Sequence, residues 1–184
     1  MSQRQLTLDE LNAGLPHVKS APKDRGELRL IVKRPRVGAR EVVDEAQLDE
    51  AVGLVGDSWH TRHNWWRKRR SPNTDAQITV MNARAIALVA QSDDRWALAG
   101  DQLYLDLDLS DENVPAGTRL AIGSAVIEVT AEPHTGCGKF STRFGVDAVK
   151  FVNSKEGRRL NLRGINTKVV QAGTIRVGDV ATKI

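Results

Sequence analysis

The chain has 184 residues, and the hydrophobic 40% of them suffice for one cooperative core, so a single domain is expected. Lys and Arg exceed Asp and Glu by 27 to 23, and this net charge of +4 permits an anionic partner without requiring one. The single cysteine excludes an internal disulfide and a four-thiolate metal site, and with them a disulfide-stapled secreted fold.

The first predicted element is a helix over residues 7–18. Thr7 is a suitable N-cap, and Glu10 can return a hydrogen bond to the cap. The helix is expected to end at residues 14–16, because the sequence there is Gly-Leu-Pro. The N-terminus lacks the features of a signal peptide, and no stretch is apolar for long enough to cross a bilayer. We therefore expect a cytoplasmic protein that does not bind membranes.

The following segments give both strand and helix signals. Residues 27–35 place apolar side chains at every second position, which is typical of a half-buried strand, and residues 40–44 can return as a second strand. Residues 44–56 carry apolar residues at roughly helical spacing, so a helix is predicted there. Residues 56–76 show no apolar periodicity and are expected to form a long loop.

The second half of the chain is dominated by short alternating segments. Strands are expected at 77–82, 102–110, 118–123, 124–131, 162–173, 174–179 and 180–184, and helices at 83–92 and 140–154, the latter broken near Gly145. Gly123-Ser124 is expected to form a tight hairpin turn. Because no strand–helix–strand alternation is sustained, the predicted fold class is mainly β with scattered helices, an antiparallel barrel or sandwich.

The only cysteine, Cys137, lies between two glycines in the segment EPHTGCGKFSTRFG, residues 132–145. A helix is expected to begin just after it, and the free N–H groups of that helix would favour the reactive thiolate. Lys139 and Arg143 add positive charge and are candidate anion ligands, while His134 is a candidate proton partner. A lone cysteine often packs as a small hydrophobic residue, but these polar, glycine-rich flanks favour a functional thiol.

A basic and aromatic segment, HTRHNWWRKRRS, occupies residues 60–71. Arg67 and the tryptophans suit a lip over an anionic cofactor, a contact to single-stranded nucleic acid, or simply an exposed loop. His60 and His63 have no acidic or thiol partner nearby in the sequence, so a zinc site is weakly supported. Asp57 is expected to hold its loop by accepting backbone N–H bonds.

Four segments, taken in order, resemble the MOSC domain, the C-terminal domain of molybdenum cofactor sulfurases, which also occurs as a stand-alone bacterial protein. They are GDSWH at 56–60, AGDQLYLDLDLS at 99–110, EPHTGCGKFSTRFG at 132–145 and RGINTKVVQAGTIRVGD at 163–179. The resemblance covers roughly residues 28–179, which is nearly the whole chain.

The resemblance implies one MOSC-type domain over residues 1–184, with an N-terminal helix and loop at 1–27 and a β-barrel core at 28–184. It implies that Cys137 carries sulfur or ligates molybdenum, and that the cofactor is molybdenum cofactor (molybdopterin). Related proteins reduce N-hydroxylated compounds, so a small-molecule substrate and an electron-donor protein are the expected partners. The oligomeric state does not follow from the sequence.

The residues that would bind the cofactor follow from the matching motifs and from their charge. Asp101 and Gln102 stand where the family usually has Glu and Asn, and the other candidates are Lys139, Arg143, Arg163, His60 and Arg67. Two alternatives remain open: a metal-free protein of thiol redox or sulfur transfer, and a module that binds single-stranded nucleic acid through the Trp/Arg loop. Nucleic acid ranks last, because a net charge of +4 is modest for such a protein.

Overall fold

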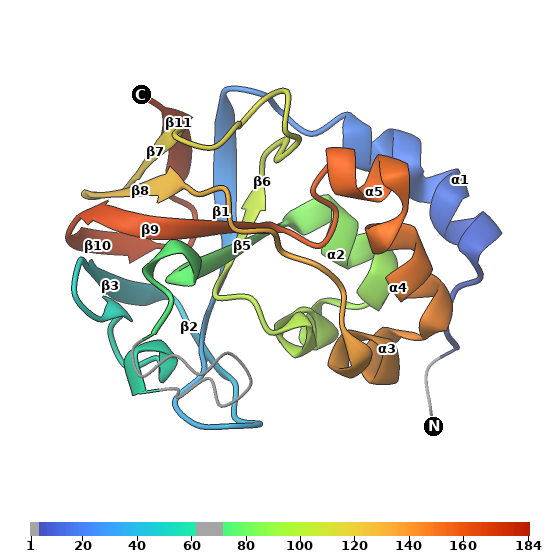
Figure 1. The fold of residues 1–184 in the computed structure, drawn as a ribbon, viewed down its shortest axis with the longest axis horizontal. Helices are drawn as coiled ribbons and strands as arrows, with labels where there is room; N and C mark the ends of the chain where they lie inside the picture. Colours follow the sequence, from blue (N-terminus) through green and yellow to red (C-terminus); the bar gives the residue numbers. More distant parts are fainter. Residues whose placement is uncertain (1–3, 62–71) are drawn as a thin grey trace.

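A computed structural model describes residues 4–61 and 72–184 of the protein (Figure 1). The helices are α1 Leu8–Lys19, α2 Ala83–Ala90, α3 Gly138–Phe144, α4 Val146–Asn153 and α5 Lys155–Arg159. The strands are β1 Arg25–Lys33, β2 Glu41–Val43, β3 Glu45–Asp49, β4 Gly53–Leu54, β5 Ile78–Asn82, β6 Leu103–Asp106, β7 Arg119–Ile122, β8 Ala125–Val129, β9 Ile165–Gln171, β10 Gly173–Arg176 and β11 Val180–Lys183. In Figure 1 the strands fill one side of the molecule and the helices gather on the other.

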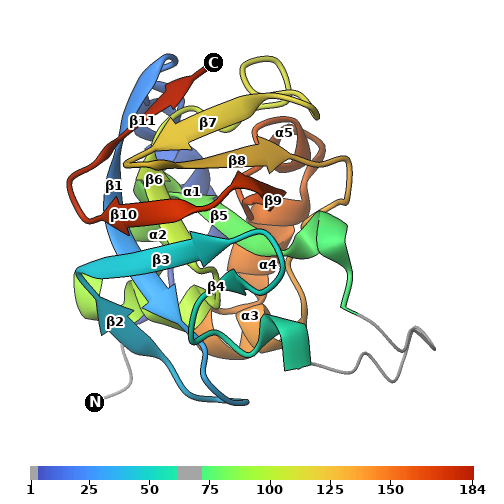
Figure 2. The ribbon, with the colours of Figure 1, turned by 90° about the vertical axis from the view of Figure 1, so that its left-hand side faces the viewer.

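Seven strands close into a barrel. Their order is β11-β7-β8-β9-β5-β6-β1, and β1 completes the circle by pairing with β11 as well as with β6. The β5–β6 pair is parallel, whereas the other pairings found in the described ranges are antiparallel. Strand β2 extends the sheet at β1, and β10, β3 and β4 form a small second sheet beside the barrel (Figure 2). The predicted, mainly antiparallel barrel is therefore confirmed.

Alternating side chains divide the core into two layers. Leu103, Leu105, Leu107 and Leu109 point into the barrel, as their spacing predicted. Tyr104, between the first two, belongs instead to the layer between barrel and helices, together with Phe140 of α3. The helices therefore cover the outer face of the strands that carry these residues. None of the helices in the described ranges is long and apolar enough to span a bilayer.

The local turn and capping signals are confirmed. Thr7 and Glu10 form the reciprocal capping box at the start of α1. Ile122 pairs with Ala125, so Gly123-Ser124 is a two-residue hairpin turn. The helical segment 140–154 is broken at Gly145, which has a φ of 98° and separates α3 from α4.

Two predictions about helices are wrong. The segment 44–56 forms strands β3 and β4, because Ala46 and Leu48 also alternate with polar residues and β10 offers a pairing edge. Helix α1 continues to Lys19 with Pro16 inside it rather than ending at residues 14–16. Gly14 lies against Leu88 of α2, and a Cβ at this position would fit only if Leu88 shifted. The glycine therefore allows α1 and α2 to pack closely. Helix α5 was not predicted.

Candidate functional site

Cys137 lies at the N-terminal end of α3, on the loop that follows β8. The residue caps the helix in an extended conformation, and its side chain is exposed. The start of a helix directly after the cysteine confirms the prediction from the sequence. The thiol is therefore accessible rather than packed among aliphatic side chains, as a reactive sulfur requires.

The surroundings of Cys137 lower the pKa of its thiol from the ordinary value. Partial burial raises the pKa, but the backbone amides of Phe140 and Lys139 lower it, and so do the positive charges of Arg163 and Lys139. The lowering contributions prevail, so the thiolate is favoured more than in a free cysteine.

We expect alkylation of Cys137 by iodoacetamide to show a pH midpoint below that of a model thiol, for which the pKa is about 8.5. Lys139→Ala is expected to move the midpoint upward, because one of the nearby positive charges is lost. Lys150→Ala, which removes an exposed charge paired with Asp147, is the matched control and should leave the midpoint in place. A wild-type midpoint at or above that of the model thiol would contradict this assignment.

Asn153, at the end of α4, holds the peptide next to the thiol. Its Oδ1 accepts a hydrogen bond from the amide of Gly136 at 2.9 Å, and its Nδ2 donates to the carbonyl of the same residue at 3.0 Å. A Cβ at Gly136 would lie 2.9 Å from a methyl group of Val152, so glycine allows this close approach. Sequence reasoning missed Asn153, because nothing in the motif points to a residue sixteen positions beyond the cysteine.

Asn153→Ala is expected to lower the free energy of unfolding by about 1–3 kcal/mol, since two hydrogen bonds to a half-buried peptide are lost. The amide of Gly136 should also exchange its hydrogen faster, which NMR can follow. Asn153→Asp keeps an acceptor for that amide and should lose less protection. Unchanged exchange at Gly136 in Asn153→Ala would show that the clamp does not hold the loop.

A buried ion pair joins two of the predicted residues behind the thiol loop. Nη1 of Arg163 donates to Oδ2 of Asp101 at 2.6 Å, and Asp101 is fully buried. Arg163 also donates to the carbonyl of Ala99 and lies over the ring of Phe140, with 4.9 Å from its Cζ to the ring centroid. The pair thus ties the segment before β9 to the segment before β6 and to helix α3.

His134 approaches the same carboxylate from the other side. Its Nδ1 lies 3.5 Å from Oδ1 of Asp101. The pKa of His134 is lowered to about 4, first by burial and then by the charge of Arg163, while Asp101 opposes the shift. Gly164, with a φ of 109°, permits this packing, because a Cβ there would lie 2.4 Å from the carbonyl oxygen of Val80 and 3.2 Å from Nδ1 of His134.

A second buried ion pair supports the same segment. Asp57 accepts hydrogen bonds from Nε and Nη2 of Arg34, and also from the backbone amides of Arg34 and Trp59. The expected loop-holding role of Asp57 is confirmed. Arg34 donates in addition to the carbonyl of Gly100, directly before Asp101. Arg34 was not recognised from the sequence, because a basic residue at the end of a strand is usually exposed.

A pocket of about 420 Å³ that is lined by basic side chains, here called the basic pocket, lies between α3 and the loop joining β1 to β2. Its lining residues are Val37, Gly38, Arg40, Lys139, Thr142 and Arg143, so no carboxylate lines it within the described ranges. Arg40 and Arg143 donate instead to main-chain carbonyls. The pKa of Arg40 is lowered, by burial first and then by the charges of Arg143 and Arg34. A bound anion would relieve this repulsion.

The structure brings most of the predicted site residues together. Cys137, Lys139 and Arg143 lie on α3 or at its start, while Asp101, Arg163 and His134 form one contact group behind them. The imidazole of His134 is paired with Asp101, and its role as proton partner of the thiol stays a prediction. Arg40, the third basic residue of the basic pocket, was not recognised from the sequence.

The remaining candidates lie apart from this group. The amide of Gln102 is used within the barrel: Oε1 accepts from Thr79 and Nε2 donates to the carbonyl of Gln77. His60 is exposed in the short 3-10 turn Trp59–Thr61. Arg67 lies outside the described residues. The cofactor-binding roles of these three residues stay predictions.

Comparison with known proteins places this chain in a family. The sequence model of the MOSC domain matches residues 67–182. A crystal structure of the YuaD protein from Bacillus subtilis is 15% identical and has a TM-score of 0.62, covering 86% of this chain and 96% of that chain. The YiiM structure from Escherichia coli is 17% identical with a TM-score of 0.55, covering 86% and 69%.

A further similar structure is YiiM from Geobacillus stearothermophilus, 15% identical with a TM-score of 0.59, covering 86% of this chain and 75% of that chain. The search of curated proteins found no match. At these identities the solved structures show the fold alone, whereas the MOSC sequence model matches well over half of the chain. The chain therefore belongs to the MOSC domain family.

Proposed function

We propose that this MOSC protein binds molybdenum cofactor, or carries sulfur for it, through Cys137. The observation that carries the proposal is the position of an exposed thiol, favoured as thiolate, at the start of the helix that also lines the basic pocket. A thiolate is a soft ligand suited to molybdenum or to a transferable sulfur atom.

The residues fit the two chemically different ends of such a cofactor. Cys137 would hold the metal or sulfur end. Arg40, Lys139 and Arg143 would hold the phosphate, since their charges meet no carboxylate in the described part of the pocket. When bound, the cofactor supplies the redox chemistry of molybdenum.

The protein's own residues would orient the cofactor and keep the thiol in position and in its thiolate form. Asn153 fixes the peptide before Cys137, and the buried Asp101–Arg163 pair supports the start of α3 from behind. The charge of Arg163 also stabilises the thiolate. Reduction of N-hydroxylated small molecules is the activity we propose for the loaded protein, with electrons supplied by a partner protein in a reducing cytoplasm.

Metal analysis of protein produced in a molybdenum-replete host tests the proposal. Wild type should carry molybdenum, and Cys137→Ser should reduce it to background. The double variant Arg40→Met/Arg143→Met should also lose cofactor, because the phosphate end is no longer neutralised. Arg29→Met, which removes an exposed charge on β1, is the control and should keep wild-type occupancy.

A metal-free sulfur carrier is the second candidate, and the exposed thiol supports it as well. Protein that carries a persulfide on Cys137 but never molybdenum would favour this candidate. Full molybdenum occupancy in Cys137→Ser would exclude the thiol as the ligand that holds the metal, and a wild type that never carries persulfide would exclude the carrier role.

A further inference from the structure

A pocket of about 310 Å³ lies between the segment after β8 and the turn after α5. We call it the β8–α5 pocket; its lining includes Val129, His134, Val152, Arg163, Ile165 and Asn166. Its volume is at the lower end of the range for small-molecule sites. The lining is mixed: apolar side chains such as Val129, Val152 and Ile165 lie beside polar ones, and His134 is one of the polar side chains that line the pocket.

The two ring nitrogens of His134 are in different surroundings. Among the described residues, Nδ1 is enclosed and makes no hydrogen bond within normal limits, and the same holds for Oδ1 of Asp101, 3.5 Å away. Nε2 is not enclosed in this way, and the side chain keeps 17% of its surface exposed in a residue that lines the pocket. The free edge of the ring therefore faces the pocket.

The position of Asp101 selects one tautomer of the imidazole. A neutral imidazole carries a single N–H. With the proton on Nδ1, that N–H points to Oδ1 of Asp101; with the proton on Nε2, two enclosed acceptors would face each other, which is unfavourable. The low pKa of His134 keeps the ring neutral at pH 7: burial lowers it most, the charges of Arg163 and Arg34 lower it too, and Asp101 opposes the shift without reversing it. Nε2 is then a hydrogen-bond acceptor directed to the pocket.

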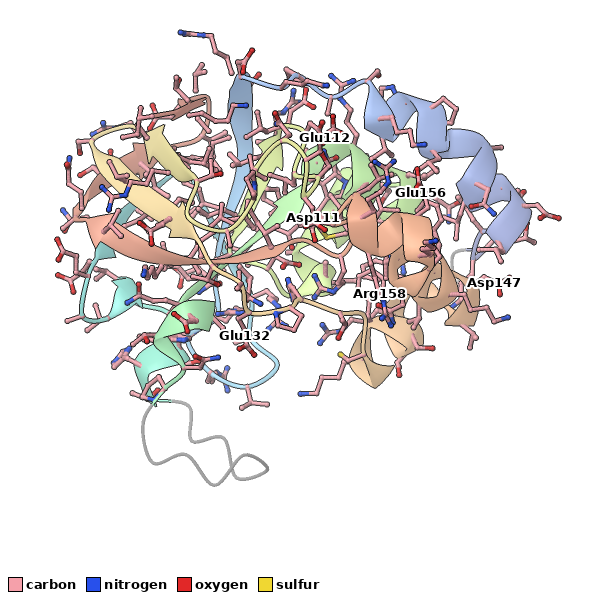
Figure 3. The ribbon with its side chains drawn as sticks, turned by 45° about the horizontal axis from the view of Figure 1, so that its top comes forward. Asp111, Glu112, Glu132, Asp147, Glu156 and Arg158 are labelled. Atoms are coloured by element: carbon pink, nitrogen blue, oxygen red, sulfur yellow. The ribbon has the colours of Figure 1, made fainter. Side chains whose placement is uncertain are left out.

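The charges around the pocket favour an uncharged ligand. Figure 3 labels Asp111, Glu132 and Arg158, which line the pocket from the segment after β6, the segment after β8 and helix α5. Arg163 is already neutralised by Asp101. Because the charged side chains that line the pocket carry both signs, neither a strong anion nor a strong cation is favoured.

We propose that the β8–α5 pocket binds a small uncharged molecule whose N–H or O–H donates to Nε2 of His134, with Asp101 fixing the tautomer that makes Nε2 an acceptor. The aliphatic part of the lining, Val129, Val152 and Ile165, suits an apolar, flat body of the ligand. The proposal does not require bound cofactor, so it stands apart from the function proposed above.

Nitrogen-15 NMR of the histidine rings in metal-free protein tests the tautomer. The signals of His134, assigned by their loss in His134→Gln, should show a protonated Nδ1 and an unprotonated Nε2 at pH 7. His17, exposed on α1, supplies the control signals of an unconstrained ring. A proton on Nε2, or a charged ring at pH 7, would overturn the proposal.

Matched probes test the ligand chemistry on the same samples. Phenol and indole should shift the Nε2 signal of His134 on titration, and should bind about 3- to 10-fold more tightly than anisole and 1-methylindole, which lack the donor. The difference should vanish in His134→Gln. Equal binding of donor and methylated probes to wild type, or no binding of either, would overturn the proposal whatever the molybdenum assay shows.

Discussion

Replacing Arg163 by methionine is expected to lower the free energy of unfolding by about 3–5 kcal/mol, because breaking a buried ion pair leaves an uncompensated charge. The carboxylate left behind belongs to Asp101, which is fully buried and holds Nη1 of Arg163 at 2.6 Å. The bond to the carbonyl of Ala99 and the contact with Phe140 are lost as well. Urea unfolding followed by circular dichroism measures the loss.

Two variants make this result interpretable. Arg159→Met removes an exposed arginine whose pairing with Glu156 is open to solvent, so the unfolding midpoint should hardly move. The double variant Arg163→Met/Asp101→Leu should recover part of the lost stability, since neither buried charge remains. If Arg163→Met unfolds at the wild-type urea concentration, the pair is not buried as the structure has it.

Lowering the pH from 6.5 to 4.5 is expected to cost the wild type on the order of 2–3 kcal/mol more of unfolding free energy than it costs His134→Gln. In the folded protein the pKa of His134 is about 4, below its ordinary 6.5. Between these two values the unfolded chain binds a proton that the folded protein excludes, so stability falls as the pH falls. The glutamine variant cannot take up this proton.

Urea unfolding at a series of pH values between 4.5 and 7.5 measures the two slopes. The lowered pKa values of Glu10 and Glu156, about 2 in each case, lead to proton uptake mainly below pH 4.5 and affect both proteins equally. Parallel slopes for wild type and His134→Gln would mean that the imidazole is hydrated in the folded protein. The tautomer argument for the β8–α5 pocket would then fail too.

The thiol and the charged residues of its motif could be recognised from the sequence. Cys137 has glycine neighbours and no apolar run around it, and the exposure of the sulfur follows from that. Lys139 and Arg143 come within the same turn or the next one of α3, so local spacing sufficed to place them beside the thiol. Their partner Arg40 comes from the β1–β2 loop, which no local pattern connects with α3.

Local chemistry also determined much of the fold. Alternation predicted the barrel strands, because one face of each must be apolar whatever its neighbours are. The capping box of α1 and the Gly123-Ser124 hairpin were recognisable, since each satisfies its backbone within a few residues. The segment 44–56 was predicted wrongly because the spacing of its apolar residues fits both a helix and a strand. The pairing of β3 with β10 stabilises the strand conformation.

The sequence by itself therefore determined the elements whose hydrogen bonds close locally, together with the accessible thiol and the family. Only the tertiary structure decided which distant residues meet: Asp101 with Arg163 and His134, and Gly136 with Asn153. The physical reason is that barrel closure through β1 and β11 brings together segments far apart in the chain. Burial then strengthens the ion pairs and hydrogen bonds between these residues. No local pattern in the sequence indicates which residues meet or how deeply they are buried.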